Sequence, residues 1–224
     1  MKIEEKRHGE TARQYAYRTL RGNIISLDLE PGAPFNDVEM SQMIGISRTP
    51  VREAVIQLSE ESRIIEIFPQ RGMRIALIDV ELVEEARFLR LVLEKAAVEL
   101  VCQADEEDLR WLDENIRLQE FYLEGGSSQK LLELDNKMHR KLFSICRKEL
   151  TYEMCQRLAI HYDRIRSLSV ATVKDHKIIE DHKKLLEAIR RRDKKQAVEI
   201  MELHLNRWML NEQMFRNRYP AYFK

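Results

Sequence analysis

The chain has 224 residues, 44% of them hydrophobic and 34% charged, with only 7 Gly and 5 Pro, a composition that favours helices over sheets. Its 38 basic residues balance its 38 acidic ones, and the first 78 residues are balanced too. This excludes nucleic-acid binding through bulk charge, so any such binding must depend on where individual arginines and lysines lie.

The first third of the chain consists of short elements separated by turns. A helix is predicted over residues 12–26, ended by a turn at 29–32, and Asp37 is expected to cap a second helix that runs to about Met43. After a turn at Gly45, Ser47 is expected to cap a third helix. Strands at 64–68 and 73–78 follow, joined by a turn at 69–72. Three helices and one hairpin predict a winged helix-turn-helix domain over residues 1–78.

Residues 79–224 are predicted to form a second domain of long amphipathic helices. Asp79 is a plausible cap for the first, which carries a seam of apolar residues about one turn apart from Leu82 to Leu100. Further helices are expected at about 105–124, 128–147, 149–169, 174–191 and 193–217. The expected fold class is therefore all-α with a small β-hairpin: an N-terminal winged helix-turn-helix followed by a C-terminal antiparallel helical bundle.

The start of the third helix carries residues suited to reading DNA. Arg48 and Arg52 lie four residues apart, on one helix face, and a guanidinium can donate two hydrogen bonds to the O6 and N7 atoms of guanine. The hydroxyls of Ser47 and Thr49 suit phosphate oxygens. At the hairpin tip, Arg71 and Gly72 are placed to put a cation in the adjacent minor groove. The competing interpretation is a pair of arginines on a solvated helix face.

Four polar residues of the second domain lie where helical periodicity calls for apolar ones. Asp135 and His139 are one turn apart on an apolar stripe, and His182 and His204 each lie in the middle of another. A single histidine in such a place is more often a hydrogen-bonded core residue. Three histidines and a carboxylate on three helices, however, suit a first-row divalent metal ion, with coordination positions left for water or an oxyanion.

The DNA-reading segment resembles a known family. Leu-Glu-Pro-Gly at 29–32, Gly-Ile-Ser-Arg-Thr-Pro-Val-Arg-Glu-Ala at 45–54 and Arg-Gly at 71–72 are similar to the DNA-binding domain of the GntR family of bacterial regulators. The resemblance implies contacts with double-stranded DNA from Ser47, Arg48, Thr49, Arg52, Arg71 and Gly72. The chain departs from the family at Val38, where many members carry a basic or polar residue, so one phosphate contact is in doubt.

The second domain resembles the FCD effector domain found in the FadR-type branch of this family. The shared pattern is Asp135-x3-His139, an acidic residue and histidine at 181–182, and His204 a further 22 residues on. The resemblance implies a bundle that dimerises and binds zinc, nickel or manganese through Asp135, His139, His182 and His204. It also implies that small carboxylate effectors complete the coordination of the metal.

Four more residues are candidates for effector binding. Arg157, His161 and Arg164 share one helix face that could hold a carboxylate; the alternatives are a solvated face and, for His161, a role behind the metal ligands. Arg90 matches an arginine common in the first helix of the family's bundle, and it faces either the pocket or Glu94 at i+4.

The leading hypothesis is a ligand-responsive repressor that binds a pseudo-palindromic operator as a homodimer, because one recognition helix reads only a few base pairs. The alternatives are a regulator whose effector is the metal ion itself and, less favoured, a metal-dependent hydrolase. The short junction at residues 74–79 contains no Gly or Pro and is expected to couple the two domains.

The expected location is the cytoplasm. The three cysteines are odd in number and form no Cys-x2-Cys pair, which fits a reducing compartment. Residues 1–10 are polar, unlike a signal peptide, and no apolar run is long enough to span a membrane.

Overall fold

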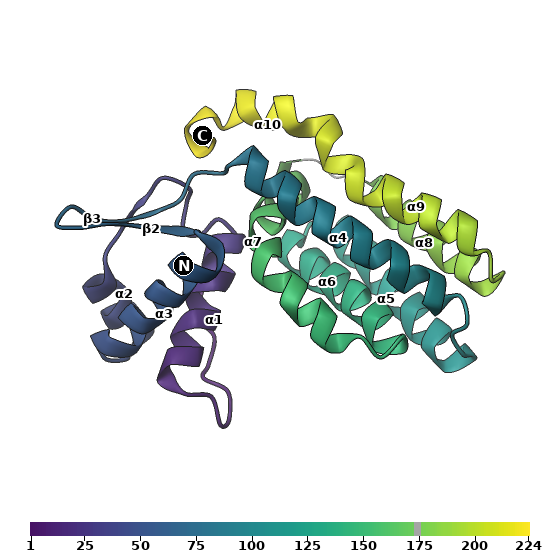
Figure 1. The fold of residues 1–224 in the computed structure, drawn as a ribbon, viewed down its shortest axis with the longest axis horizontal. Helices are drawn as coiled ribbons and strands as arrows, with labels where there is room; N and C mark the ends of the chain where they lie inside the picture. The colour runs from purple at the N-terminus through teal and green to yellow at the C-terminus, as the bar shows by residue number, and fades with distance from the viewer. Residues whose placement is uncertain (173–175) are drawn as a thin grey trace.

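A computed structural model describes residues 1–172 and 176–224, apart from the side chains of Trp208 and Leu210. The N-terminal part contains three helices and a small sheet at one end of the molecule (Figure 1). These are α1 (Ala12–Ile25), β1 (Pro34–Phe35), α2 (Asp37–Ile44), α3 (Arg48–Ser62), β2 (Ile65–Phe68) and β3 (Gly72–Ile75). The expected winged helix-turn-helix is therefore present, and α3 is its recognition helix.

The sheet has three antiparallel strands in the order β1-β3-β2, one more than the expected hairpin. The added strand, β1, is only two residues long and begins with Pro34, which pairs with Arg74. Proline is tolerated at a sheet edge because its missing N–H is not needed there. Two residues carry no readable alternation, so the sequence could not predict this strand.

Helix caps explain most of the boundaries in this part. Thr11 and Gln14 form a reciprocal capping box at the start of α1. Asn36, and not Asp37 as expected, caps α2, because its side chain accepts hydrogen bonds from the N–H groups of Val38 and Glu39. Gly45 ends α2 at a φ of 75°, a conformation that glycine adopts without strain.

Among the described residues, the C-terminal part is a bundle of six helices with a short C-terminal extension. The helices are α4 (Val80–Val101), α5 (Glu106–Glu124), α6 (Ser128–Ile145), α7 (Glu149–Thr172), α8 (His176–Arg190) and α9 (Lys194–Asn206). The predicted start of the fifth helix at residue 174 lies outside the described residues. Helix α4 packs against α7 and α9, while α5 packs against α6 and α8.

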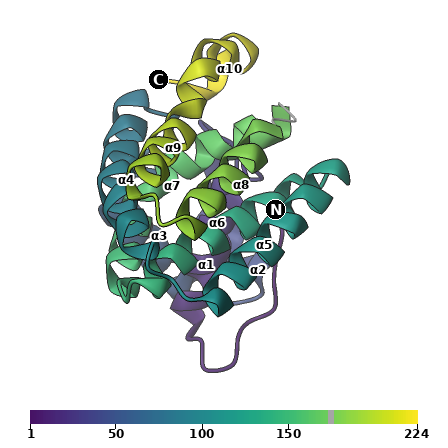
Figure 2. The same ribbon diagram turned by 90° about the vertical axis from the view of Figure 1, so that its right-hand side faces the viewer.

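The last helix is shorter than expected. Instead of running to residue 217, α9 ends at Asn206 and is followed by the 3-10 turn η1 (Arg207–Asn211), by α10 (Glu212–Arg218) and by the 3-10 turn η2 (Pro220–Tyr222). The tightening occurs where Arg207 pairs with Asp181 of α8, a tertiary contact that local sequence does not announce. This extension leads the chain away from the bundle (Figures 1 and 2).

The C-terminus fastens the junction between the two parts. The N–H of Ile78 donates to the carbonyl of Tyr222, and the N–H of Lys224 donates back to Ile78. The Lys224 ammonium also pairs with Asp79, which caps α4 as expected. The junction is therefore held by backbone pairing and is not a free hinge.

Among the described residues, each part has one large hydrophobic core, and Ala97, Phe143 and Tyr152 form a small separate cluster in the bundle. One large core is built from residues 15–75, the other from residues 78–223. Ile160 of α7 is the exception: it is fully buried in the N-terminal core, although its helix belongs to the bundle. Within the described ranges, no helix combines the length and apolar character needed to cross a bilayer.

Candidate functional site

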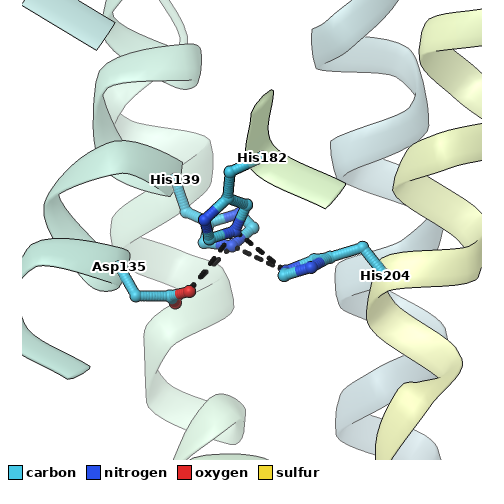
Figure 3. A group of neighbouring side chains, drawn as sticks. All are labelled: Asp135, His139, His182 and His204. Atoms are coloured by element: carbon cyan, nitrogen blue, oxygen red, sulfur yellow. Dashed lines mark hydrogen bonds and ion pairs between the residues drawn. The ribbon is translucent and has the colours of Figure 1, made fainter. Parts of the chain in front are cut away.

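The four residues singled out in the bundle converge on one point (Figure 3). Asp135 and His139 come from α6, His182 from α8 and His204 from α9. The carboxylate and the first two imidazoles are buried, and His204 is partly buried. One potential ligand atom from each residue lies within 4.8 Å of all the others. The sequence prediction that these side chains share a site is thus matched by their placement.

The ligand atoms have the spacing that a metal ion requires. Nε2 of His204 lies 3.3 Å from Nε2 of His139 and 3.4 Å from Nε2 of His182. Oxygens of Asp135 lie 3.6 Å from Nε2 of His139 and 3.4 Å from Nε2 of His182. Ligands about 2.0–2.1 Å from a tetrahedral ion would be about 3.3–3.4 Å apart. The spacing of the four donors therefore fits a first-row divalent ion.

Each imidazole turns its other nitrogen toward an oxygen. Nδ1 of His139 contacts a carboxylate oxygen of Glu94, and Nδ1 of His182 lies 2.8 Å from Oε1 of Gln119. Nδ1 of His204 faces Asp181 at 3.8 Å, beyond a direct hydrogen bond. An acceptor at Nδ1 places the proton there and leaves the Nε2 lone pair free. For His139 and His182, this leaves two buried Nε2 lone pairs beside Nε2 of His204, and lone pairs that face one another make no hydrogen bond, which favours a shared cation.

Their surroundings keep Asp135, His139 and His182 in the protonation states that bind metals. Burial lowers the pKa of His139, and burial together with the neighbouring His204 lowers that of His182 well below its usual value. Burial opposes ionisation of Asp135, but the surrounding positive charge, that of Arg166 above all, outweighs it and lowers the pKa of Asp135. Neutral imidazoles and an ionised carboxylate are the forms that ligate metals.

Glu94 is ionised for the same kind of reason. Burial opposes its charge, but Arg90 and His139 more than compensate and lower the pKa of Glu94 to about 2. Both expectations for Arg90 are met together: its guanidinium pairs with Glu94, and the residue lines the cavity beside the histidines.

That cavity has a volume of about 50 Å³, enough for a few water molecules or a small ligand. Asp135 and His204 of the candidate metal cluster line one edge of it, and Arg90, Arg166 and Arg207 line it from three helical segments, each of them ion-paired with a carboxylate of the chain. Tyr162, Ser169 and Asn211 add further polar groups, and Leu131, Leu132, Val170 and Ile178 supply an apolar wall. Three arginines beside a candidate metal centre suit an anionic ligand.

The structure does not bring Arg157, His161 and Arg164 to this cavity. Arg157 is exposed, whereas the other two face the N-terminal part. Nε2 of His161 lies 2.5 Å from the carbonyl oxygen of Ser62, and Arg164 donates to the carbonyls of Ala76 and Leu77 in the junction. Periodicity correctly groups His161 and Arg164 on one side of α7, but that side packs against the N-terminal part.

A row of paired charges leads from the cluster to α1. Arg166 of α7 pairs with Asp135 and donates to Oδ1 of Asp163 at 2.6 Å. The other oxygen of Asp163 lies 4.0 Å from Nη2 of Arg21 on α1, and the same Nη2 donates to the carbonyl of Gln156 at 2.9 Å. A candidate metal ligand is thus connected to the N-terminal part through three side chains.

The candidate DNA-reading residues all lie on the surface. Ser47, Arg48, Thr49 and Arg52 are exposed at the start of α3, and Arg71 and Gly72 are exposed at the tip of the β2–β3 hairpin. Ser47 occupies the cap position of α3, but its hydroxyl makes no capping hydrogen bond. A groove lined by Arg48, Arg52, Phe68 and Gly72 runs between the helix and the hairpin. This arrangement has the form by which a winged helix meets duplex DNA.

The fold defines a winged helix-turn-helix domain joined to a helical bundle, a class that the comparisons with known proteins make specific. Residues 12–75 match the gntR family of bacterial regulatory proteins, and residues 85–207 match the FCD domain. The chain belongs to the GntR family and carries an FCD domain. It is a transcription regulator and not an enzyme, because its family and its relatives over most of its length are transcription regulators.

The relatives cover most of the chain. The HTH-type transcriptional repressor RspR of Escherichia coli is 30% identical over 194 residues, which are 86% of this chain and 85% of RspR. The solved structure of E. coli McbR/YncC superposes with a TM-score of 0.79 at 19% identity, covering 93% of this chain and 99% of that one. A GntR regulator from Rhodococcus sp. RHA1 gives 0.73 at 18% identity, covering 87% and 94%. These two structures support the fold.

Proposed function

We propose that the protein is a metal-dependent, carboxylate-responsive repressor that binds a pseudo-palindromic DNA operator as a homodimer. Residues 1–78 would read the DNA, and residues 79–224 would bind the effector and the partner subunit. The observation that carries the proposal is the convergence of three Nε2 atoms and one carboxylate beside a cavity faced by three arginines.

The metal would be held by Asp135, His139, His182 and His204. Zinc suits this set of nitrogen and oxygen donors, and nickel or manganese are the alternatives. A bound ion would supply a positive centre to which a carboxylate oxygen can bind. The chain's own residues would orient the rest of the effector: Arg90, Arg166 and Arg207 line the cavity, and a second oxygen of the ligand would bind one of these guanidinium groups alongside or in place of the carboxylate that now pairs with it.

The DNA contacts would come from α3 and the wing. Arg48 and Arg52 would read base edges, Ser47 and Thr49 would bind phosphates, and Arg71 with Gly72 would approach the minor groove. The exposure of all these residues supports the assignment. Repression is proposed because RspR, which is named a repressor, is similar over most of the chain.

The homodimer would form through α4 and α7, which pack side by side (Figure 1). Each of these helices leaves an apolar pair in solvent: Phe88 and Val92 on α4 are 64% and 50% exposed, and Leu150 and Met154 on α7 are 69% and 63% exposed. Exposed large apolar side chains at helical spacing mark a surface suited to a second copy of the chain.

One experiment distinguishes the proposed function from the alternatives, a regulator that senses the metal ion alone and a bundle that senses no ligand. The metal-free protein is loaded with zinc, small carboxylates are screened by thermal shift, and affinity for operator DNA is measured with and without each hit. A carboxylate that changes DNA affinity only in the zinc-loaded protein supports the proposal. A response to zinc alone, with no carboxylate effect, would instead make the ion the effector. DNA binding that ignores both would contradict a sensing role for the bundle.

A further inference from the structure

A buried carboxylate contacts an arginine that is proposed to read the DNA. Asp37 is the first residue of α2, and its side chain is only 6% exposed. Its Oδ2 accepts a hydrogen bond from Nε of Arg48 at 3.0 Å, while the Arg48 side chain stays 56% exposed. The contact joins the two helices of the helix-turn-helix at the point where α3 begins.

Capping does not account for this carboxylate. Acidic residues at such positions often accept hydrogen bonds from the first N–H groups of the helix. Here Asn36 accepts from the N–H groups of Val38 and Glu39. Asp37 is instead buried against a cation, and a buried carboxylate without such a partner would be costly. Asp37 therefore holds one edge of the Arg48 guanidinium in place.

The contact with Asp37 uses only the Nε side of the Arg48 guanidinium. With Nε bound to Asp37, the Nη1 and Nη2 groups remain to donate outward, and two parallel donors match the O6 and N7 acceptors of guanine. The carboxylate also offsets part of the Arg48 charge, which weakens attraction to any nearby phosphate. Both effects favour base reading over unspecific binding.

We propose that Asp37 is a positioning residue that orients Arg48 for guanine and thereby sets operator specificity. The inference rests on the proposed DNA contact of Arg48. Asp37 itself touches no base in this arrangement and acts through Arg48 alone. The competing explanation is structural: a negative charge in the first turn of α2 would stabilise the helix whatever Arg48 does.

The test compares the full-length protein with Asp37→Asn, which keeps the size of the side chain and removes its charge. Glu39→Gln is the control, because it removes an exposed charge from the same helical turn. The probe is the duplex that the parent enriches from a randomised library, together with the same duplex mutated at each guanine and an unrelated duplex. The guanine whose mutation no longer matters in Arg48→Ala is assigned to Arg48.

We expect Asp37→Asn to lose roughly 2- to 10-fold of the discrimination at that guanine, the cost of ordering one long side chain during binding. Affinity for unrelated DNA should stay the same or rise, and Glu39→Gln should match the parent. In the Arg48→Ala background, Asp37→Asn should have no further effect on discrimination.

The outcomes distinguish failure of the Asp37 proposal from failure of its premise, the DNA contact of Arg48. Equal losses on the enriched and unrelated duplexes, or a loss that persists without Arg48, would make Asp37 structural while leaving DNA reading intact. If the parent enriches no duplex, or if Arg48→Ala retains sensitivity at every guanine, the reading role of Arg48 fails and the proposal fails with it.

Discussion

Replacing Arg21 with methionine should weaken the dependence of DNA affinity on the effector, while the protein still binds each ligand. Arg21 lies on α1 and makes two contacts with the bundle, a hydrogen bond to the carbonyl of Gln156 at 2.9 Å and an ion pair with Asp163 at 4.0 Å. The charge-assisted hydrogen bond contributes about 1.5–3 kcal/mol. The ion pair adds no more than about 1 kcal/mol, because the Arg21 side chain is 23% exposed and the pair is screened by solvent.

These contacts are large enough to carry an ordinary allosteric coupling of about 1–3 kcal/mol, equivalent to a 5- to 150-fold change in affinity. We therefore expect Arg21→Met to reduce the effect of the ligand on DNA affinity at least roughly fivefold, while each ligand still binds alone. The loss of both contacts, about 1.5–4 kcal/mol in the free energy of unfolding, should lower the melting temperature by roughly 3–16 °C.

The assay measures operator affinity by fluorescence anisotropy, with and without zinc and the carboxylate found by thermal shift. Arg13→Met is the matched control, because Arg13 is an exposed arginine on the same helix. If Arg21→Met keeps the full response of the parent, the coupling does not pass through this contact. A loss of effector response in Arg13→Met as well would point to a general effect of charge on α1.

Three further predictions follow from the sites. The double variant His182→Ala, His204→Ala should lose the roughly one divalent ion per chain expected of the parent by elemental analysis; unchanged metal content would refute the site. Arg48→Ala and Arg52→Ala should each cost about 1–3 kcal/mol of base discrimination in binding titrations and leave the fold intact, and parent-like binding by both would refute the reading face. Phe88→Glu should shift the protein toward monomer in sedimentation equilibrium, since it places a charge in the proposed interface; an unshifted dimer would exclude this face.

Helical periodicity predicted the candidate metal cluster, and the same signal could have pointed to Gln119, which contacts one of the histidines. Asp135, His139, His182 and His204 were visible because each interrupts an apolar stripe. Gln119 does the same on α5, between Ile116 and Leu123, and it is fully buried against His182. The interruption shows only that a polar group is buried, so the role of Gln119 at Nδ1 required the structure.

Other contacts could not be predicted, because they join segments that are distant in the sequence. Glu94 looks like an ordinary partner of Arg90 one turn away, and its second contact, with His139, depends on how α4 packs against α6. In the same way, His161 and Arg164 have the pattern of a ligand-binding face. Their hydrogen-bond partners lie in the N-terminal part, and the sequence around His161 and Arg164 does not predict contacts with it.

Helix α7 belongs to both parts of the molecule, and this gives the proposed switch a physical basis. Tyr162, Arg166 and Ser169 recur at helical spacing and face the cavity. Two residues before Arg166 and on another side of the helix, Arg164 holds the carbonyls of the junction, and Ile160 is buried in the N-terminal core.

A helix is stiff over this length, so a ligand that moves Arg166 must also move or strain the groups that hold the junction. The junction expected to couple the domains is thus tied to α7 and does not act independently of it. The effector can shift DNA affinity only as far as it binds the two positions of α7 with different affinity, and DNA must shift effector affinity by the same factor.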